Sequence, residues 1–521
     1  MPATPPRPAL RPAALARLTR HLEGSSSAPP LAVRAPWTGE VITELPATDP
    51  ADVAGAAAAA RQAQTRWARE PVRRRCEVLR RFRALLLTRR EDLLDLLQTE
   101  TGKARLHALE EVLDVAGQID YYTARAEELL ASRPRAGVVP GLTQVTEHRH
   151  PKGLIGVIAP FNYPLTLSIG DAIPALLAGN GVLCKPAPQT PLSILAAVDL
   201  LVAAGLPRGL LTVVTGDGAE LGRAVTDAVD HVSFTGSSAT GAAVAAHAGS
   251  RLIGFTGELG GKNPLIVLDD ADPAAAAHGA AAACFANTGQ LCVSPERLYA
   301  TAPVYTAFVD ALVERASGLR LGPGYDWDID VGSLTTPRQL ETVTAHVADA
   351  RARGARVLVG GRARPDLGPL FYEPTVLEGV TADMAVCAQE TFGPVVAVYR
   401  VADAHEAVMR ANEGVYGLSA SVWGSPAAAR RVATQIRAGA VNINDGYAAA
   451  LASHDAPMGG MGASGVGRRH GSQGLLGCTE PQTVATQRLA PLARPAWLEG
   501  RRYAGLLLAT LGLQERLRGP R

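Results

Sequence analysis

The spacing of hydrophobic positions along the chain predicts a helical part followed by a part that alternates strands and helices. Between Asp49 and Gly102 the apolar residues recur every three or four positions, as in RRRCEVLRRFRALLLTRREDLLDLLQTETGK, a period typical of amphipathic helices. From Gly153 onward short apolar runs alternate with helical stretches; the runs include LIGVIAP, GVLCKPA, LLTVVTG, DHVSFTG, PLIVLDD, RLYATAP, VVAVYRV and GAVNIND. This alternation predicts buried parallel sheets covered by helices, an α/β fold in which ligands bind beyond the carboxyl ends of the strands.

Two segments far apart in the sequence have a polar, alternating pattern. They lie within residues 132–151 (TQVTEHRHPKG) and 478–490 (TEPQTVATQR). Polar strands of this kind are often edge strands that pair with each other or with another subunit. We therefore expect a small β extension that serves oligomerisation, in a homodimer or homotetramer.

The two ends of the chain differ from the rest in composition. The first thirty or so residues are rich in Pro, Ala, Arg and Ser, which predicts a mobile arm with one short helix; a transit peptide is the less favoured alternative. The tail over residues 491–521 contains a short apolar helix with Arg at both ends. It is too short to cross a membrane, so we expect it to dock onto the body of the protein or onto a partner, with interfacial membrane contact as an alternative.

Composition narrows the possible functions. A length of 521 residues favours two to four domains, and the net charge of +2 gives no field that would draw the chain onto nucleic acid. No stretch reaches the ~18 apolar residues of a transmembrane helix. The six cysteines are scattered, without a CxxC pair or a Cys/His cluster, which argues against a disulfide framework or a metal site and favours the cytoplasm: Cys76, Cys184, Cys284, Cys292, Cys387 and Cys478.

Lysine is rare in this chain. Only four of its 51 basic residues are lysines, namely Lys103, Lys152, Lys185 and Lys262. Each of these lysines could mark a position where a compact ammonium serves better than a guanidinium, although chance survival explains it equally well.

Three segments carry residues suited to acyl chemistry. Cys292 in FANTGQLCVS follows small and polar residues in a loop, and a thiolate is a strong nucleophile towards carbonyl carbon. Glu258, before LGGKNP, stands among apolar residues that would raise its pKa and suit it to act as a general base on water. Asn162, between Pro160 and Pro164, could donate its amide N–H to an oxyanion. Taken singly, a buried cysteine, a capping or ion-paired glutamate and a turn asparagine are the simpler interpretations.

Seven motifs in order identify a family resemblance. PFNYP, KPAPQTP, FTGSSATG, ELGGKNP, NTGQLCVS, ETFGPV and PMGGMGASGVGRRHG occur in the order and approximate spacing of the aldehyde dehydrogenase superfamily, over roughly Thr38 to Leu489. The resemblance implies an aldehyde dehydrogenase-like α/β fold with a Rossmann-type cofactor-binding domain (1–131 and 152–258), an α/β catalytic domain (259–460), the two oligomerisation segments and the tail. It implies oxidation of an aldehyde with NAD or NADP through a cysteine thioester, without a metal.

The same resemblance assigns roles residue by residue. Cys292 falls on the nucleophile, Glu258 on the general base and Asn162 on the oxyanion donor. The residues that fall on the cofactor site, with Gly236 and Ser237 at a helix start that could receive the pyrophosphate, are Phe161, Lys185, Pro188, Gly236, Ser237, Leu259, Glu390 and Phe392. Phe161 replaces the usual tryptophan, and Gly462 stands where many members have lysine.

Pro188 bears on the choice of cofactor. NAD-preferring members commonly have a glutamate at this position, and its carboxylate would repel the 2′-phosphate of NADP. We therefore expect NADP to serve at least as well as NAD.

The motif pattern most resembles bacterial succinate-semialdehyde dehydrogenases. Other aliphatic or aromatic aldehydes remain open, because no residue stands out as the anchor of a carboxylated substrate. An acylating relative that transfers the thioester to coenzyme A is less favoured, because such members generally lack the glutamate found here at Glu258. A catalytically idle relative is less favoured because the three catalytic candidates are all present.

Overall fold

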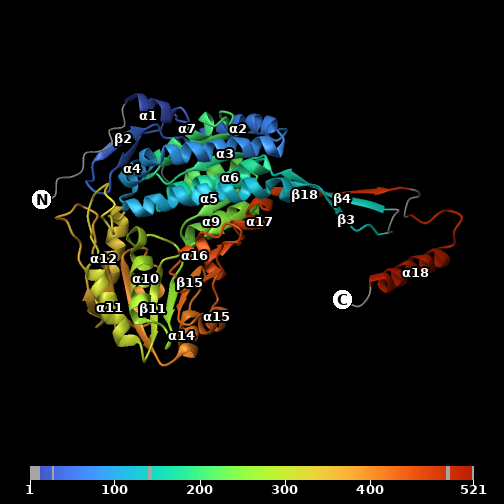
Figure 1. Ribbon diagram of the computed structural model, residues 1–521. Helices are drawn as coiled ribbons and strands as arrows, with labels where there is room; N and C mark the ends of the chain where they lie inside the picture. The colour runs from blue at the N-terminus through green and yellow to red at the C-terminus, as the bar shows by residue number, and fades with distance from the viewer. Residues whose placement is uncertain (1–11, 26–27, 139–142, 217, 489–492, 519–521) are drawn as a thin grey trace.

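The computed structural model describes residues 12–25, 28–138, 143–216, 218–488 and 493–518. It contains two large sheets, each flanked by helices, and a narrow β extension that projects from the body (Figure 1). The α/β architecture with parallel sheets is the one predicted from the sequence.

The first large sheet has six strands in the order β17-β9-β8-β5-β6-β7 and is parallel except for β17. Its strands are β5 (Leu154–Ile158), β6 (Gly181–Lys185), β7 (Leu211–Val213), β8 (His231–Thr235), β9 (Gly254–Glu258) and β17 (Gly465–Val466). From β5 the chain adds β6 and β7 on one side and then β8 and β9 on the other. The order therefore reverses between β5 and β8, and the crevice at the carboxyl ends of these two strands is where such sheets bind ligands.

Helices cover this sheet, and the region from Asp49 to Gly102 predicted to be helical contains three of them. In the second of these, the buried side chains Cys76, Leu79, Phe82 and Leu86 follow the helical period. The helices of this half are α2 (Val53–Trp67), α3 (Val72–Thr88), α4 (Arg90–Thr101), α5 (Arg105–Leu130), α6 (Pro164–Ala178), α7 (Leu192–Ala203), α8 (Ala219–Ala228) and α9 (Ser238–Ser250).

The second large sheet has seven strands in the order β12-β13-β14-β11-β10-β15-β16, of which only the pair β12–β13 is antiparallel. The strands are β10 (Asn263–Val267), β11 (Pro295–Thr301), β12 (Arg356–Val359), β13 (Thr375–Glu378), β14 (Val395–Val401), β15 (Ser419–Trp423) and β16 (Ala440–Ile443). Its helices are α10 (Pro273–Phe285), α11 (Tyr305–Ser317), α12 (Pro337–Ala352), α13 (Ala385–Ala388), α14 (Ala404–Ala411), α15 (Pro426–Ala433) and α16 (Ala448–Leu451). The next helix, α17 (Gly471–Leu476), packs on α5 and α6 of the first half.

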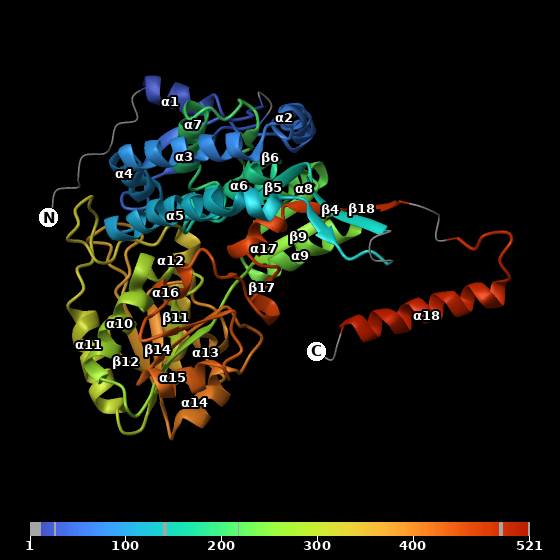
Figure 2. The same cartoon turned by 45° about the vertical axis from the view of Figure 1, so that its right-hand side comes forward.

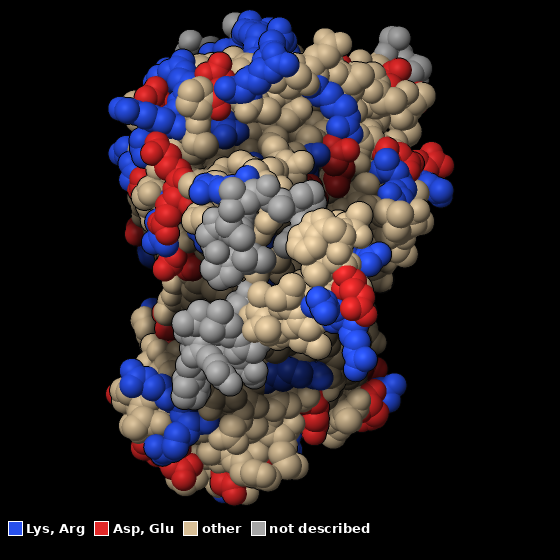
Figure 3. Space-filling model, turned by 90° about the vertical axis from the view of Figure 1, so that its right-hand side faces the viewer, with Lys and Arg blue, Asp and Glu red and all other residues tan. Residues whose placement is uncertain are grey.

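The two polar segments pair with each other, as their pattern predicted. β18 (Thr479–Gln487) runs antiparallel to β4 (Thr143–Pro151) over nine residue pairs, and β3 (Arg133–Arg135) adds a third strand. Most side chains of β18 are exposed. Figure 3 looks along this extension and shows acidic and basic side chains intermixed on that face.

Near the two ends, short helices and a hairpin complete the described chain: α1 (Pro12–Thr19), β1 (Leu31–Arg34), β2 (Val41–Leu45) and α18 (Gly500–Arg518). The predicted short N-terminal helix is thus present, while the rest of the predicted arm, residues 1–11, lies outside the described residues. The tail does not dock onto the body in this structure, so that alternative is wrong, while docking onto a partner stays a prediction. Both views place α18 apart from the body (Figure 2), and Leu508 on it is 68% exposed. In the described part of the chain, no helix has the length and apolarity that a membrane crossing requires.

Candidate active site

A cavity of about 570 Å³ opens at the crevice between β5 and β8. The loop after β5 contributes Pro160, Phe161 and Asn162, and the turn after β8 contributes Gly236 and Ser237. From the second half come Cys292 and, among others, Glu390 and Phe392. The topology thus brings most of the predicted site residues to one cavity, although they are spread over more than 200 positions of the chain.

Cys292 follows a short loop with unusual backbone geometry. Asn287, Thr288 and Gly289 are consecutive residues with φ values of +48°, +59° and +71°. Left-handed geometry is costly for Thr288 in particular, because its side chain is β-branched. At Gly289 a Cβ atom would lie 2.1 Å from the carbonyl oxygen of Gly393, so no side chain fits there. Strain of this kind persists only where the surrounding structure fixes it, and here it precedes the predicted nucleophile.

Side-chain amides hold the main chain of residues 287–292, the cysteine loop, by hydrogen bonds. The carbonyl oxygen of Cys292 accepts a hydrogen bond from Asn263 Nδ2 at 2.7 Å. The carbonyl oxygen of Gln290 accepts one from Asn162 Nδ2 and one from Asn287 Nδ2, each at 3.0 Å. The Asn162 amide therefore reaches the cysteine loop and keeps a second N–H, the group predicted to meet an oxyanion.

The Cys292 thiol itself is half-buried and faces the cavity. Desolvation raises its pKa to about 12, with smaller contributions in the same direction from the charges of Glu258 and Glu390, while Arg469 opposes them. At neutral pH this thiol is protonated, so it needs a nearby proton acceptor or a positive charge to become a nucleophile.

Glu258, at the end of β9, is almost fully buried, and neither carboxylate oxygen has a hydrogen-bond partner among the described residues. Desolvation raises its pKa to about 7. A Cβ atom on Gly459 would lie 2.9 Å from Glu258 Oε1, so only a glycine leaves room beside the carboxylate. A carboxyl group with this pKa is half ionised near neutrality and can both take and return a proton.

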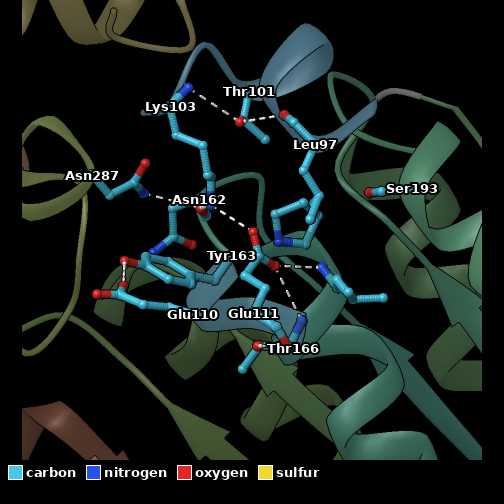
Figure 4. A network of polar contacts seen from close by, with 12 residues as sticks. Leu97, Thr101, Lys103, Glu110, Glu111, Asn162, Tyr163, Thr166, Ser193 and Asn287 are labelled. Carbon is cyan, nitrogen blue, oxygen red and sulfur yellow. Dashed lines mark hydrogen bonds and ion pairs between the residues drawn. The ribbon is translucent and has the colours of Figure 1, made fainter. Parts of the chain in front are cut away.

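Asn162 is fixed by a buried network that starts at Lys103 (Figure 4). Lys103 Nζ donates to the carbonyl oxygen of Asn162 at 2.6 Å and forms an ion pair with Glu111, also at 2.6 Å; the side chains of Lys103 and Glu111 are both fully buried. The other oxygen of Glu111 accepts the main-chain N–H groups of Leu165 and Thr166 in the first turn of α6. One buried ion pair thus ties α5, the start of α6 and the predicted oxyanion donor together.

A second buried ion pair shapes the opposite wall of the cavity. Lys262 pairs with Glu296, whose carboxylate accepts the main-chain N–H groups of Thr391 and Phe392. Phe392 has φ of +51°, and its ring meets that of Phe161 edge-on with centroids 6.1 Å apart. The two phenylalanines form aromatic walls of the cavity.

Glu390 stands next to this wall. Its Oε1 accepts the N–H of Gly261 at 3.0 Å, and desolvation raises its pKa to about 7. Gly260 also lines the cavity, where a Cβ atom would lie 2.5 Å from Glu390 Oε2. The backbone at Gly260 therefore approaches the Glu390 carboxylate as closely as only a glycine allows.

The residues that line the cavity can hold the phosphates of a nicotinamide dinucleotide. α9 begins there, with Ser237 as its N-cap, and the first N–H groups of a helix attract phosphate. Arg338 on the rim adds a positive charge, and Leu259 and Glu390 line the same space.

Lys185 and Pro188 lie outside the lining of this cavity. Lys185 ends β6, pairs in register with Ile158 and is buried, while Pro188 is half-buried in the turn that follows. Gln189, the next residue, does line the cavity. The turn therefore borders the site, and in place of the family's carboxylate it carries the neutral Pro188.

A second cavity, of about 150 Å³, adjoins the apolar cluster against which Cys292 packs. Val293, Leu418, Tyr447, Leu451 and Met458 line it, together with Ser419 and small residues. Among the described residues that line it, none is charged. This is a compartment of suitable size and polarity for the carbon chain of an aldehyde.

Sequence reasoning missed several residues that hold the site. Lys103 and Lys262 were singled out only as rare lysines, yet both form buried ion pairs that fix the loops of the site. Their partners, Glu111 and Glu296, stood in no motif; Lys262 and the clamp residue Asn263 belong to the motif ELGGKNP, but the motif gave them no role. The lysine bias was therefore the one usable signal.

Comparison with known proteins agrees with the geometry. The chain belongs to the aldehyde dehydrogenase family, whose model matches residues 22–484. Members of this family oxidise aldehydes.

A Mycobacterium tuberculosis protein named "Putative succinate-semialdehyde dehydrogenase", of the NADP(+) type, is 51% identical over 88% of this chain and 89% of its own. Among solved structures, an Escherichia coli NADP-dependent enzyme is similar with a TM-score of 0.85 and 32% identity, covering 89% of this chain and 96% of its own. The NAD+ complex of a Bacillus cereus aldehyde dehydrogenase has a TM-score of 0.86 and 32% identity, covering 92% and 99%.

Proposed function

We propose that this chain oxidises succinate semialdehyde to succinate with NADP, and that NAD serves no better. The observation that supports the chemistry is the meeting of Cys292 and Asn162 in one cavity near Glu258, a buried carboxyl group that has no hydrogen-bond partner among the described residues. The substrate and the cofactor are supported by the name of the Mycobacterium tuberculosis relative. The neutral turn at Pro188 supports the use of NADP.

Each residue has a distinct part in the proposed reaction. The Cys292 thiol loses its proton to solvent water, and the sulfur adds to the aldehyde carbon. The free N–H of the Asn162 amide donates to the resulting oxyanion. A bound nicotinamide dinucleotide supplies the hydride acceptor, and Phe161, Gly236, Ser237, Leu259, Glu390 and Phe392 would hold it. The thioester left on Cys292 is hydrolysed by a water molecule from which Glu258 takes a proton, which releases the acid and the thiol.

The test is a rate measurement with matched variants. Purified protein with NADP and succinate semialdehyde should produce NADPH, seen as absorbance in the near ultraviolet. Cys292→Ala should abolish turnover while NADPH binding, followed by its fluorescence, is retained. Turnover by Cys292→Ala at the wild-type rate would refute the proposed mechanism.

A second substrate class is favoured by one observation. The cavity of about 150 Å³ near Cys292 has no charged residue in its described lining, and an unpaired carboxylate is costly to bury. An uncharged aliphatic or aromatic aldehyde would therefore fit this compartment. Butanal has the same number of carbon atoms as succinate semialdehyde but no charge, so kcat/KM for the two compounds separates the proposals. A higher value for butanal would replace succinate semialdehyde as the proposed substrate.

We also propose that the protein is a cytoplasmic homodimer or homotetramer. The projecting sheet supports the assembly, because the side chains of β18 are largely exposed and its outer edge is unpaired among the described strands. The six free thiols support a reducing compartment. Light scattering of the full chain would give the assembly, and a monomeric mass at micromolar concentration would exclude it.

A further inference from the structure

A buried arginine stands behind the predicted catalytic pair. Arg469 lies between β17 and α17 and is 8% exposed. Its Nη2 forms an ion pair with Asp171 Oδ2 and a hydrogen bond of 2.6 Å with Thr235 Oγ1. Asp171, on α6, also accepts a hydrogen bond from Ser233 Oγ at 2.5 Å. The guanidinium is therefore held by residues of two elements, Asp171 on α6 and Thr235 on β8.

The contact with Thr235 places this cation next to the general-base candidate. Thr235 is the last residue of β8 and pairs in register with Glu258, the last residue of β9. On the other side of Glu258, β17 pairs through Gly465, four positions before Arg469. The arginine, in the segment that follows β17, thus lies close to the end of β9 that carries Glu258, and Thr235 lines the same cavity as Cys292.

We propose that Arg469 is a positioning residue of the reaction, which Asp171 and Thr235 hold so that its buried charge favours the anionic forms of Glu258 and Cys292. This inference rests on the proposed function for the roles of those two residues. Arg469 touches neither the substrate nor the cofactor in this account. It acts through the charge that it keeps in a region of low dielectric constant.

Several charged groups face the two reacting side chains. Cys292 faces Glu258 from β9, Glu390 from the loop after α13, and Arg469; the two carboxylates raise the pKa of the thiol and Arg469 lowers it. Glu258 faces Arg469 and Arg468, which lower its pKa, and Asp171 from α6, which raises it. Asp171 in turn faces Asp114 on α5. Arg469 acts on both reacting groups in the direction that produces a nucleophile and a base.

Substitutions of Arg469 and of Asp171 should shift the pKa of Glu258 in opposite directions. Arg469→Gln removes the cation, so the pKa values of Cys292 and Glu258 should rise. Asp171→Asn removes the counter-charge and leaves the arginine bound to Thr235, so the pKa of Glu258 should fall. A merely structural ion pair would lower stability in both variants without moving their pH profiles in opposite directions.

The experiment measures thiol reactivity and needs no turnover. Alkylation of Cys292 by iodoacetamide is followed against pH, with site-resolved mass spectrometry to separate it from the other cysteines. In Arg469→Gln, the rate at pH 8 should fall at least tenfold, the effect of a pKa rise of about one unit, while the rate should still increase with pH as it does in the wild type. Arg469→Lys should restore it to within about threefold of wild type. Asp199→Asn, which breaks the distant ion pair with Arg17, is the control and should leave the profile unchanged.

A second measurement covers the case in which Arg469→Gln does not fold. In Asp171→Asn, the pH dependence of thioester hydrolysis should move to lower pH. An unchanged alkylation profile in folded Arg469→Gln, or an unchanged hydrolysis profile in Asp171→Asn, overturns the proposal. Failure of the proposed function is distinguishable, because it would appear as turnover by Cys292→Ala, whereas the alkylation result concerns only the charge near the thiol.

Discussion

The ammonium group of Lys103 donates to the main-chain carbonyl of Asn162 at 2.6 Å, from a position that water does not reach. The contact fixes the backbone of the residue whose side-chain amide is proposed to bind the oxyanion. The positive charge needed for it is balanced by Glu111, which also caps the start of α6.

Lys103→Met should destabilise the protein strongly, because it leaves the Glu111 carboxylate buried without its partner. Breaking a buried ion pair in this way costs about 3–5 kcal/mol. We expect a clear fall in the midpoint of thermal unfolding, measured by circular dichroism, and a lower kcat from the displaced Asn162. The double variant Lys103→Met with Glu111→Gln should recover part of the lost stability, since no unpaired charge remains. A single variant as stable as wild type would contradict this account.

Glu258→Gln should separate acylation from hydrolysis. The first turnover still produces a burst of NADPH, because Cys292 is intact, but the steady-state rate falls since no carboxylate takes the proton of water. In the wild type the folded-state pKa is raised to about 7, so the hydrolytic rate should increase as pH rises through about 7 and level off above it. Rapid-mixing absorbance between pH 6 and 9 tests both statements. A burst followed by an unchanged steady state would remove Glu258 from the mechanism.

Gly289→Ala should disable the cysteine loop. The new methyl group would lie 2.1 Å from the carbonyl oxygen of Gly393, at a residue with φ of +71°. We expect kcat to fall by at least a hundredfold and thermal stability to drop. Gly222→Ala is a matched control: Gly222 lies within α8 with nothing within 4 Å of the added Cβ. Because alanine favours a helix by about 0.5–1 kcal/mol over glycine, this control should be neutral or slightly stabilising. Equal effects of the two variants would show that the loop geometry is unimportant.

Pro188→Glu should turn cofactor preference towards NAD. A carboxylate in this turn would repel a 2′-phosphate, by up to about 4 kcal/mol at 4 Å and an effective dielectric constant of 20. We expect the ratio of kcat/KM for NADP to that for NAD to fall at least tenfold. The control is Pro188→Gln, because glutamine has nearly the same size as glutamate but no charge. This variant should change the ratio much less. If both variants shift the ratio equally, the effect comes from the lost proline ring.

The sequence predicted the fold and the candidate reacting side chains better than it predicted the buried residues that hold those side chains in place. Motif order located Cys292, Glu258 and Asn162, and the βα alternation predicted that such loops meet at strand ends. The sequence could not show that Lys103 donates a hydrogen bond to the carbonyl oxygen of Asn162. The two residues are 59 positions apart and meet only when the helices pack. Nor could it show why Gly462 replaces a lysine: its φ is +59°, and a Cβ atom there would lie 2.5 Å from the carbonyl oxygen of Val415. Docking of the tail onto the body was predicted wrongly, and docking onto a partner stays a prediction, because an apolar helix gives no information about which surface it meets.

The high pKa of the Cys292 thiol has a consequence for the protein at rest. Peroxides attack the thiolate far faster than the thiol, and over-oxidised sulfur is not recovered. A sulfur atom that is protonated at neutral pH is protected from sulfenic and sulfonic acid formation between turnovers. Burial that slows the nucleophile in the resting protein therefore also extends its working life.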